Sequence, residues 1–85
     1  MKIALKFSNA LFKARTEQKY TQSEVAEAVS ITVRWYQKIE AGSNLPGSLT
    51  MLRLILFLHI DVEKFREEAE LVVPVSSNKR KLFLR

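Results

Sequence analysis

The sequence predicts an all-α domain of five helices, followed by a short C-terminal tail that is extended or forms a β-hairpin. Apolar residues recur every three or four positions through most of residues 1–70. The breaks between these stretches contain helix caps and turn formers. With 85 residues, 47% of them hydrophobic, the chain is large enough for one small core. We therefore predict a helical domain over residues 1–70 and a tail over residues 71–85.

The first predicted helix spans residues 3–19. Its inward face consists of apolar residues at helical spacing, namely Ile3, Phe7, Ala10, Leu11 and Ala14. Leu5 and Phe12 form a second apolar edge, which an isolated domain would not need to bury. We expect another surface to cover this edge.

The second and third predicted helices are short and are joined by a tight elbow. Thr21 and Glu24 match a capping box, which starts a helix at Thr21. Thr32 is a suitable N-cap for the next helix, and Gly42 suits the left-handed residue that follows a helix. The predicted inward residues of the two helices are Val25, Ala26, Val29, Tyr36 and Ile39.

The fourth predicted helix, residues 48–59, is apolar around most of its circumference. One stripe suits the core and consists of Met51, Leu54, Ile55 and Leu58. A second stripe of Leu49, Leu52 and Leu56 needs a further partner. Asp61 is a suitable cap for a fifth helix that continues to Ala69. The β-branched residues and the Ser-Ser-Asn turn signal after Glu70 predict the extended or hairpin tail.

Charge and composition favour a nucleic-acid partner and exclude several kinds of site. The net charge of +5 favours an anionic partner. The absence of cysteine excludes disulfides and thiol chemistry, and is compatible with the cytoplasmic location that we expect. The Leu-rich run is shorter than the roughly 20 apolar residues that span a bilayer, so we expect no membrane segment. With one His, no Gly-rich phosphate loop and no carboxylate pair in a recognisable setting, we expect no enzyme, cofactor or metal site.

One segment carries a resemblance to a known family. Residues 21–42 read TQSEVAEAVSITVRWYQKIEAG, with Pro46 shortly after and IDVEKF following the Leu-rich helix. This pattern resembles the lambda repressor and Cro family, also called the XRE family, over about residues 5–68. The resemblance implies a five-helix fold whose third helix enters the major groove of DNA.

Carried onto this chain, the resemblance places base recognition on the outward residues of the third helix, namely Thr32, Val33, Arg34, Gln37 and Lys38. Their chemistry agrees, because Arg34 can bond both acceptors of guanine, Gln37 can address adenine and Val33 can touch a thymine methyl group. The resemblance also implies that Gln22 contacts a phosphate and braces its neighbours. Ser43 and Asn44, just past the third helix, are further candidate phosphate contacts.

Three residues depart from the usual family pattern. Ser30 stands in the elbow, and His59 after the fourth helix, where the family usually has Gly. Because a non-glycine residue at positive φ is uncommon, we expect an altered or strained elbow. Tyr36 stands where the family usually buries Val or Ile.

Two further side chains have structural interpretations. We expect Glu40 to form a structural ion pair, with Arg15 as a candidate partner. Trp35 either packs against the body of the domain, which we favour, or lies on the sugar-phosphate backbone.

The favoured function is a sequence-specific transcriptional regulator, a repressor that binds double-stranded DNA as a homodimer. The candidate residues for dimer or tail packing are Leu49, Leu52, Leu56, Val73, Val75, Leu82 and Phe83. The tail is thus a candidate dimerisation arm, or it folds back over its own domain. An alternative is an antitoxin-type module whose tail binds a protein partner. A third hypothesis is a degenerate helix-turn-helix that binds protein alone.

Overall fold

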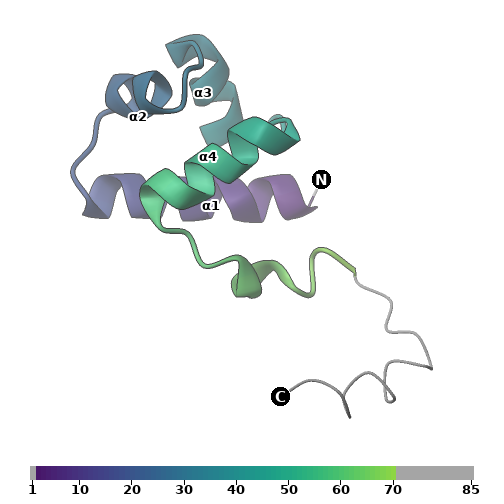
Figure 1. The fold of residues 1–85 in the computed structure, drawn as a ribbon. Helices are drawn as coiled ribbons and strands as arrows, with labels where there is room; N and C mark the ends of the chain where they lie inside the picture. Colours follow the sequence, from purple (N-terminus) through teal and green to yellow (C-terminus); the bar gives the residue numbers. More distant parts are fainter. Residues whose placement is uncertain (1, 71–85) are drawn as a thin grey trace.

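The computed structural model describes residues 2–70, which form an all-helical domain. Its α-helices are α1 (Lys2–Glu17), α2 (Gln22–Ala28), α3 (Val33–Glu40) and α4 (Ser48–Leu58), followed by the 3₁₀-helix η1 (Val62–Phe65). Helix α1 contacts α3, α4 and η1, while α2 packs against α3 (Figure 1). No strand is present within residues 2–70. The all-α prediction is therefore confirmed for the described part of the chain.

The core draws on all four α-helices. The largest fully buried side chains are Leu11 of α1, Val25 of α2, Val29 at its C-cap, Tyr36 and Ile39 of α3, and Leu54 and Leu58 of α4. Each of them was predicted to face inward. Ile3, Met51 and Ile55 are half-buried, and Met51 and Ile55 pack against the core. The hydrophobic periodicity therefore identified the largest buried side chains of each α-helix, but it missed Ala4 and Ser8, which are also buried on α1.

The predicted caps set the helix boundaries. The Thr21 hydroxyl accepts a hydrogen bond from the Glu24 N–H at 3.0 Å, and the Glu24 carboxylate accepts one from the Thr21 N–H at 2.8 Å. The Thr32 hydroxyl likewise accepts a hydrogen bond from the N–H of Trp35 at 3.1 Å. These contacts satisfy N–H groups that a first helical turn leaves without partners. Both predicted N-caps are confirmed.

The prediction of a fifth α-helix is not confirmed. Its cap is in place, because the Asp61 carboxylate accepts a hydrogen bond from the Glu63 N–H at 3.0 Å. However, the segment that follows is a 3₁₀-helix, and turns continue from it to Glu70. Phe65 packs against the core, with its ring 5.9 Å from that of Phe7, while Val62 is largely exposed. We attribute the short helix to this limited burial, because tertiary packing supplies most of the stability of a helix.

The predicted tail and its four candidate contact residues, Val73, Val75, Leu82 and Phe83, lie outside the described residues. Within residues 2–70, none of the helices has the length and apolar character required to cross a membrane.

Candidate nucleic-acid interface

The elbow between α2 and α3 is closed by a Schellman motif with a non-glycine residue at its left-handed position. Ser30 has φ of 62°, as its replacement of the family's usual Gly predicted. The Ser30 N–H donates to the Glu27 carbonyl at 3.2 Å, and the Ile31 N–H donates to the Ala26 carbonyl at 2.9 Å. These bonds satisfy carbonyls that the end of α2 leaves unpaired. The elbow therefore keeps the usual hydrogen bonds and accepts the strain of a side chain in the left-handed region.

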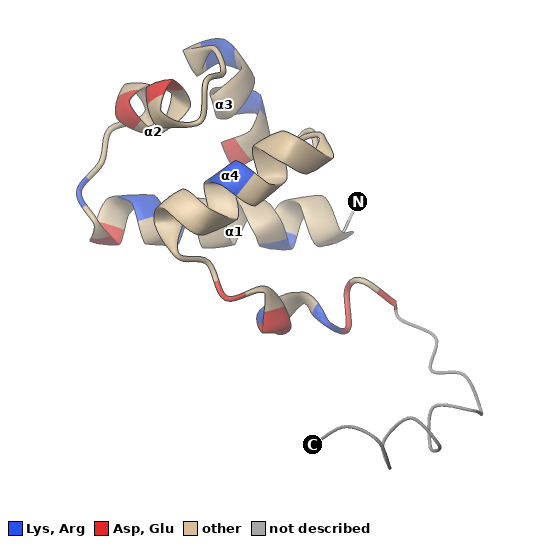
Figure 2. Ribbon diagram, viewed as in Figure 1, with Lys and Arg blue, Asp and Glu red and all other residues tan. Residues whose placement is uncertain are grey.

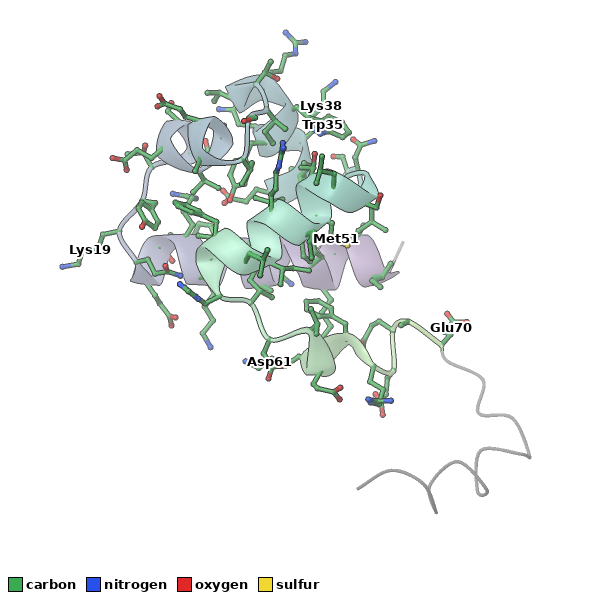
Figure 3. All side chains as sticks on the ribbon, viewed as in Figure 1. Lys19, Trp35, Lys38, Met51, Asp61 and Glu70 are labelled. Atoms are coloured by element: carbon green, nitrogen blue, oxygen red, sulfur yellow. The ribbon has the colours of Figure 1, made fainter. Side chains whose placement is uncertain are left out.

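The residues predicted to recognise bases lie together on the exposed side of α3. Thr32, at the N-cap, and Val33, Arg34, Gln37 and Lys38 are all exposed, whereas Tyr36 and Ile39 are fully buried on the opposite side. Trp35 is half-buried and packs against the core, which agrees with the favoured interpretation of this residue. In Figure 3, the labelled side chains Trp35 and Lys38 lie beside α3. The structure thus brings the five predicted residues into one accessible surface.

Charge is distributed unequally between the two helices of the motif. Figure 2 shows basic residues on α3 and acidic residues on α2. The cations are Arg34 and Lys38, and the anions are Glu24 and Glu27, all of them exposed. Because DNA phosphates attract cations and repel carboxylates, the surface of α3 is the more favourable of the two for DNA.

Below this surface, the carboxylate of Glu40 joins α1, α2 and α3. Its Oε2 accepts hydrogen bonds from Arg15 Nε and from the Tyr36 hydroxyl, both at 2.7 Å. Its Oε1 accepts hydrogen bonds from Arg15 Nη2 at 2.9 Å and from Gln22 Nε2 at 2.8 Å. The predicted ion pair with Arg15 is therefore confirmed, and the Glu40 side chain is only 7% exposed.

The electrostatics of this cluster keep the carboxylate ionised. Burial by itself would raise the pKa of Glu40, but the hydrogen bonds from Arg15, Tyr36 and Gln22 outweigh burial and hold the pKa below its ordinary value. Burial, together with the hydrogen bond to Glu40, raises the pKa of Tyr36. At neutral pH, the cluster therefore contains a charged Glu40, a charged Arg15 and a neutral Tyr36.

The predicted phosphate contacts fall into two structural settings. Ser43 and Asn44 are exposed in the loop after α3, which turns at Gly42 with φ of 85°. Gln22 is half-buried: its Nε2 donates to Glu40, and its Oε1 accepts a hydrogen bond from Gln37 Nε2 at 3.2 Å. The structure thus shows Gln22 bracing a neighbour, as the resemblance implied, while its predicted phosphate contact stays a prediction.

Sequence reasoning missed the connection from Glu40 to Gln22, because 18 residues separate the two side chains. One local signal was available. Tyr36 lies one helical turn before Glu40, where its hydroxyl can reach the carboxylate. A buried Tyr needs a hydrogen-bond partner, so this replacement of an aliphatic residue pointed to a polar cluster beneath α3.

The second apolar stripe of α4 is exposed, as predicted. Leu49, Leu52 and Leu56 are 58%, 54% and 66% exposed. Leu5 and Phe12 on α1 are also largely exposed. Residues 2–70 therefore leave two sets of large apolar side chains uncovered.

Comparison with known proteins identifies the family. The profile of a helix-turn-helix family matches residues 11–65, which is more than half of the chain and includes α2, the elbow, α3 and α4. A search of curated proteins finds no match to the chain. The chain belongs to the helix-turn-helix family of the lambda repressor and Cro (XRE) type, a family of DNA-binding transcriptional regulators.

Proposed function

We propose that this protein is a repressor that recognises a specific double-stranded DNA site as a homodimer, with α3 in the major groove. The observation that carries the proposal is the exposed face of α3, which holds hydrogen-bonding and basic side chains above a fully buried underside. A major groove about 12 Å wide admits one α-helix, and bases are distinguished by their hydrogen-bonding edges. A protein that binds its DNA site through such a surface blocks transcription by occupying that site.

Individual residues of this face suit different base edges. The Arg34 guanidinium matches the two acceptors of guanine, the Gln37 amide matches adenine, and Val33 suits a thymine methyl group. The Thr32 oxygen accepts the capping hydrogen bond, so its hydroxyl hydrogen serves as a donor to DNA. Lys38 supplies a further donor, and Ser43 and Asn44 contact phosphates that fix the register.

The proposed dimer uses the exposed stripe of α4. A two-fold dimer places two α3 helices in successive major grooves about 34 Å apart, so that one short helix per subunit specifies a longer site. The stripe of Leu49, Leu52 and Leu56 offers apolar area whose burial favours association. Residues 1–70 form the DNA-binding domain in this proposal, and residues 71–85 serve as an additional dimerisation arm.

The DNA-binding proposal is tested by selecting sites from a random double-stranded DNA pool and then measuring the affinity of paired variants. Arg34→Ala combined with Lys38→Ala removes two cations from α3. Lys13→Ala combined with Lys64→Ala removes two exposed cations from α1 and η1. Loss of one or two base contacts of about 1–3 kcal/mol each lowers affinity for the selected site roughly tenfold or more in the first pair. An equal effect of the control pair would indicate attraction by net charge alone, and would contradict recognition by α3.

The dimer is tested by measuring the mass of the protein in solution. Sedimentation equilibrium at high micromolar concentration is expected to give twice the chain mass of 9.8 kDa. A strictly monomeric protein would refute the dimer. Co-purification with a protein partner from the native host is the test of the antitoxin-type alternative, in which the tail binds that partner.

A further inference from the structure

An open apolar groove of about 270 Å³ lies between α1, α4 and η1. Most of its wall consists of apolar side chains, namely Ile3, Phe7, Met51, Ile55, Phe65 and Ala69. A cavity of roughly 150 Å³ takes up one benzene molecule, so this groove has room for about three side chains of the size of Leu or Val. In Figure 1, η1 lies on the opposite side of α1 from α2 and α3. The groove is therefore separate from the proposed DNA-binding surface.

The described part of the chain ends beside this groove. Ala69 belongs to the groove wall, and Glu70 is the next residue. An ion pair holds the preceding turn against α1, because Lys6 Nζ lies 3.0 Å from Glu68 Oε1. The same ammonium group lies 5.9 Å from the centre of the Phe65 ring. The residues that follow Glu70 therefore start at the edge of an uncovered apolar surface.

The backbone at Glu70 is of the kind that ends a helical turn and reverses the chain. Glu70 has φ of 54°, in the left-handed region. Its N–H donates to the Glu67 carbonyl at 3.0 Å, and the Ala69 N–H donates to the Phe65 carbonyl at 2.9 Å. At helix ends of this type, the residue after the left-handed one often packs against an apolar residue about five or six positions earlier. Here those two residues are Leu71 and Phe65, and Phe65 lines the groove.

We propose that residues 71–75, which lie outside the described part of the chain, fill this groove in their own subunit. The segment reads LVVPV and consists of apolar residues alone, as the wall of the groove requires. Pro74 restricts Val73 to extended conformations, and the side chains of an extended segment alternate between two sides. With Leu71 toward Phe65, Val73 and Val75 fall on the same side as Leu71. This arrangement supplies the three apolar side chains for which the groove has room.

The same segment of a second subunit is the competing occupant of the groove. The chain's own segment needs no linker, because it begins directly after the groove wall at Ala69. A contact within one chain also has the advantage of a high effective concentration. The inference goes beyond the proposed function, since it makes residues 71–75 the root that attaches the proposed dimerisation arm to its own domain. Burial of this root completes the core between α1, α4 and η1.

The first test compares two neighbouring substitutions in the full chain. In the proposed arrangement, Val73→Asp places a carboxylate in the groove, whereas Val72→Asp makes the same change on the opposite side of the segment. We expect Val73→Asp to lower the Tm, measured by circular dichroism, by roughly 6 °C or more, because a buried apolar side chain is lost. Val72→Asp should leave the Tm within roughly 3 °C of wild type. Equal effects of the two substitutions, or no effect of either, would overturn the inference.

The second test distinguishes the two possible sources of the segment, and uses a chain that contains no cysteine of its own. Val62→Cys combined with Val73→Cys places one thiol in the groove wall and one in the segment. Lys64→Cys combined with Val73→Cys is the matched control, because Lys64 lies in the same 3₁₀-helix but not in the groove wall.

A short bis-maleimide should link the first pair of thiols within one chain, and should link them faster than the control pair. Mass spectrometry identifies the linked peptides and the number of chains in the product. A link between two chains, or equal rates for both pairs, would overturn the inference. Both tests are made without DNA, so their outcome is independent of the proposed function.

Discussion

Replacing Tyr36 by Phe tests how strongly the polar cluster under α3 stabilises the fold. The ring is fully buried, and its hydroxyl donates to Glu40 Oε2 at 2.7 Å. Phe fills nearly the same space, so the main loss is one hydrogen bond to a charged group, which contributes about 1.5–3 kcal/mol. We expect the free energy of unfolding to fall by roughly 2 kcal/mol, near the middle of that range. For a domain of this size, this lowers the Tm by about 8–16 °C.

The assay is urea unfolding of wild type and variant at neutral pH, followed by circular dichroism. The matched control is Tyr20→Phe. The Tyr20 ring packs against Phe57 at a centroid distance of 4.9 Å, and its hydroxyl has no hydrogen-bond partner within residues 2–70. The control should change stability by less than about 0.5 kcal/mol. If Tyr36→Phe is as mild as the control, the hydroxyl does not stabilise the ionised Glu40, and the reasoning about the cluster is wrong.

Three further predictions concern the same domain. Because the pKa of Glu40 lies below its ordinary value of 4.5, the stability that this group contributes is present above pH 4.5 and is lost as pH falls through the lowered pKa. Glu40→Gln should therefore make the free energy of unfolding less dependent on pH in this range. The same pH dependence in wild type and variant would contradict the lowered pKa of Glu40. Ser30→Gly removes the strain of a side chain at φ of 62° and should raise the free energy of unfolding, measured in urea titrations, by up to about 1 kcal/mol. A destabilised variant would mean that the serine is not strained. Leu52→Lys, on the exposed stripe of α4, should leave stability within about 0.5 kcal/mol and abolish self-association in sedimentation experiments, and an intact dimer would locate the interface elsewhere.

Much of the fold was predictable because its helix boundaries are encoded locally. Thr21 with Glu24, Thr32 and Gly42 mark helix ends by contacts within a few residues, and the structure contains each of these features. The fifth helix was harder to predict, because the spacing of apolar residues along the sequence does not show whether another part of the fold covers them. With Val62 largely exposed, the segment is only a short 3₁₀-helix.

The exposed face of α3 was predictable for the same local reason, since helical periodicity separates Arg34 and Gln37 from Tyr36 and Ile39. The hydrogen bonds between helices were harder to predict from the sequence. That Gln22 reaches both Glu40 and Gln37 depends on how α2 and α3 cross, which no spacing along the chain specifies. The ion pair of Glu40 with Arg15 was predicted from the sequence, whereas the other hydrogen-bond partners of the Glu40 carboxylate are known only from the structure.

The buried pair of Arg15 and Glu40 makes the helix-turn-helix segment dependent on a residue outside it. Arg15 lies in α1 and supplies two of the four hydrogen bonds that Glu40 accepts. A peptide of residues 21–42 would contain the whole sequence motif and yet lose those two bonds, along with the apolar surface of α1 beneath α3. The segment that is transferable as a pattern is therefore not transferable as a folded unit. Grafting its specificity onto another protein would require a host that provides its own arginine beneath the graft.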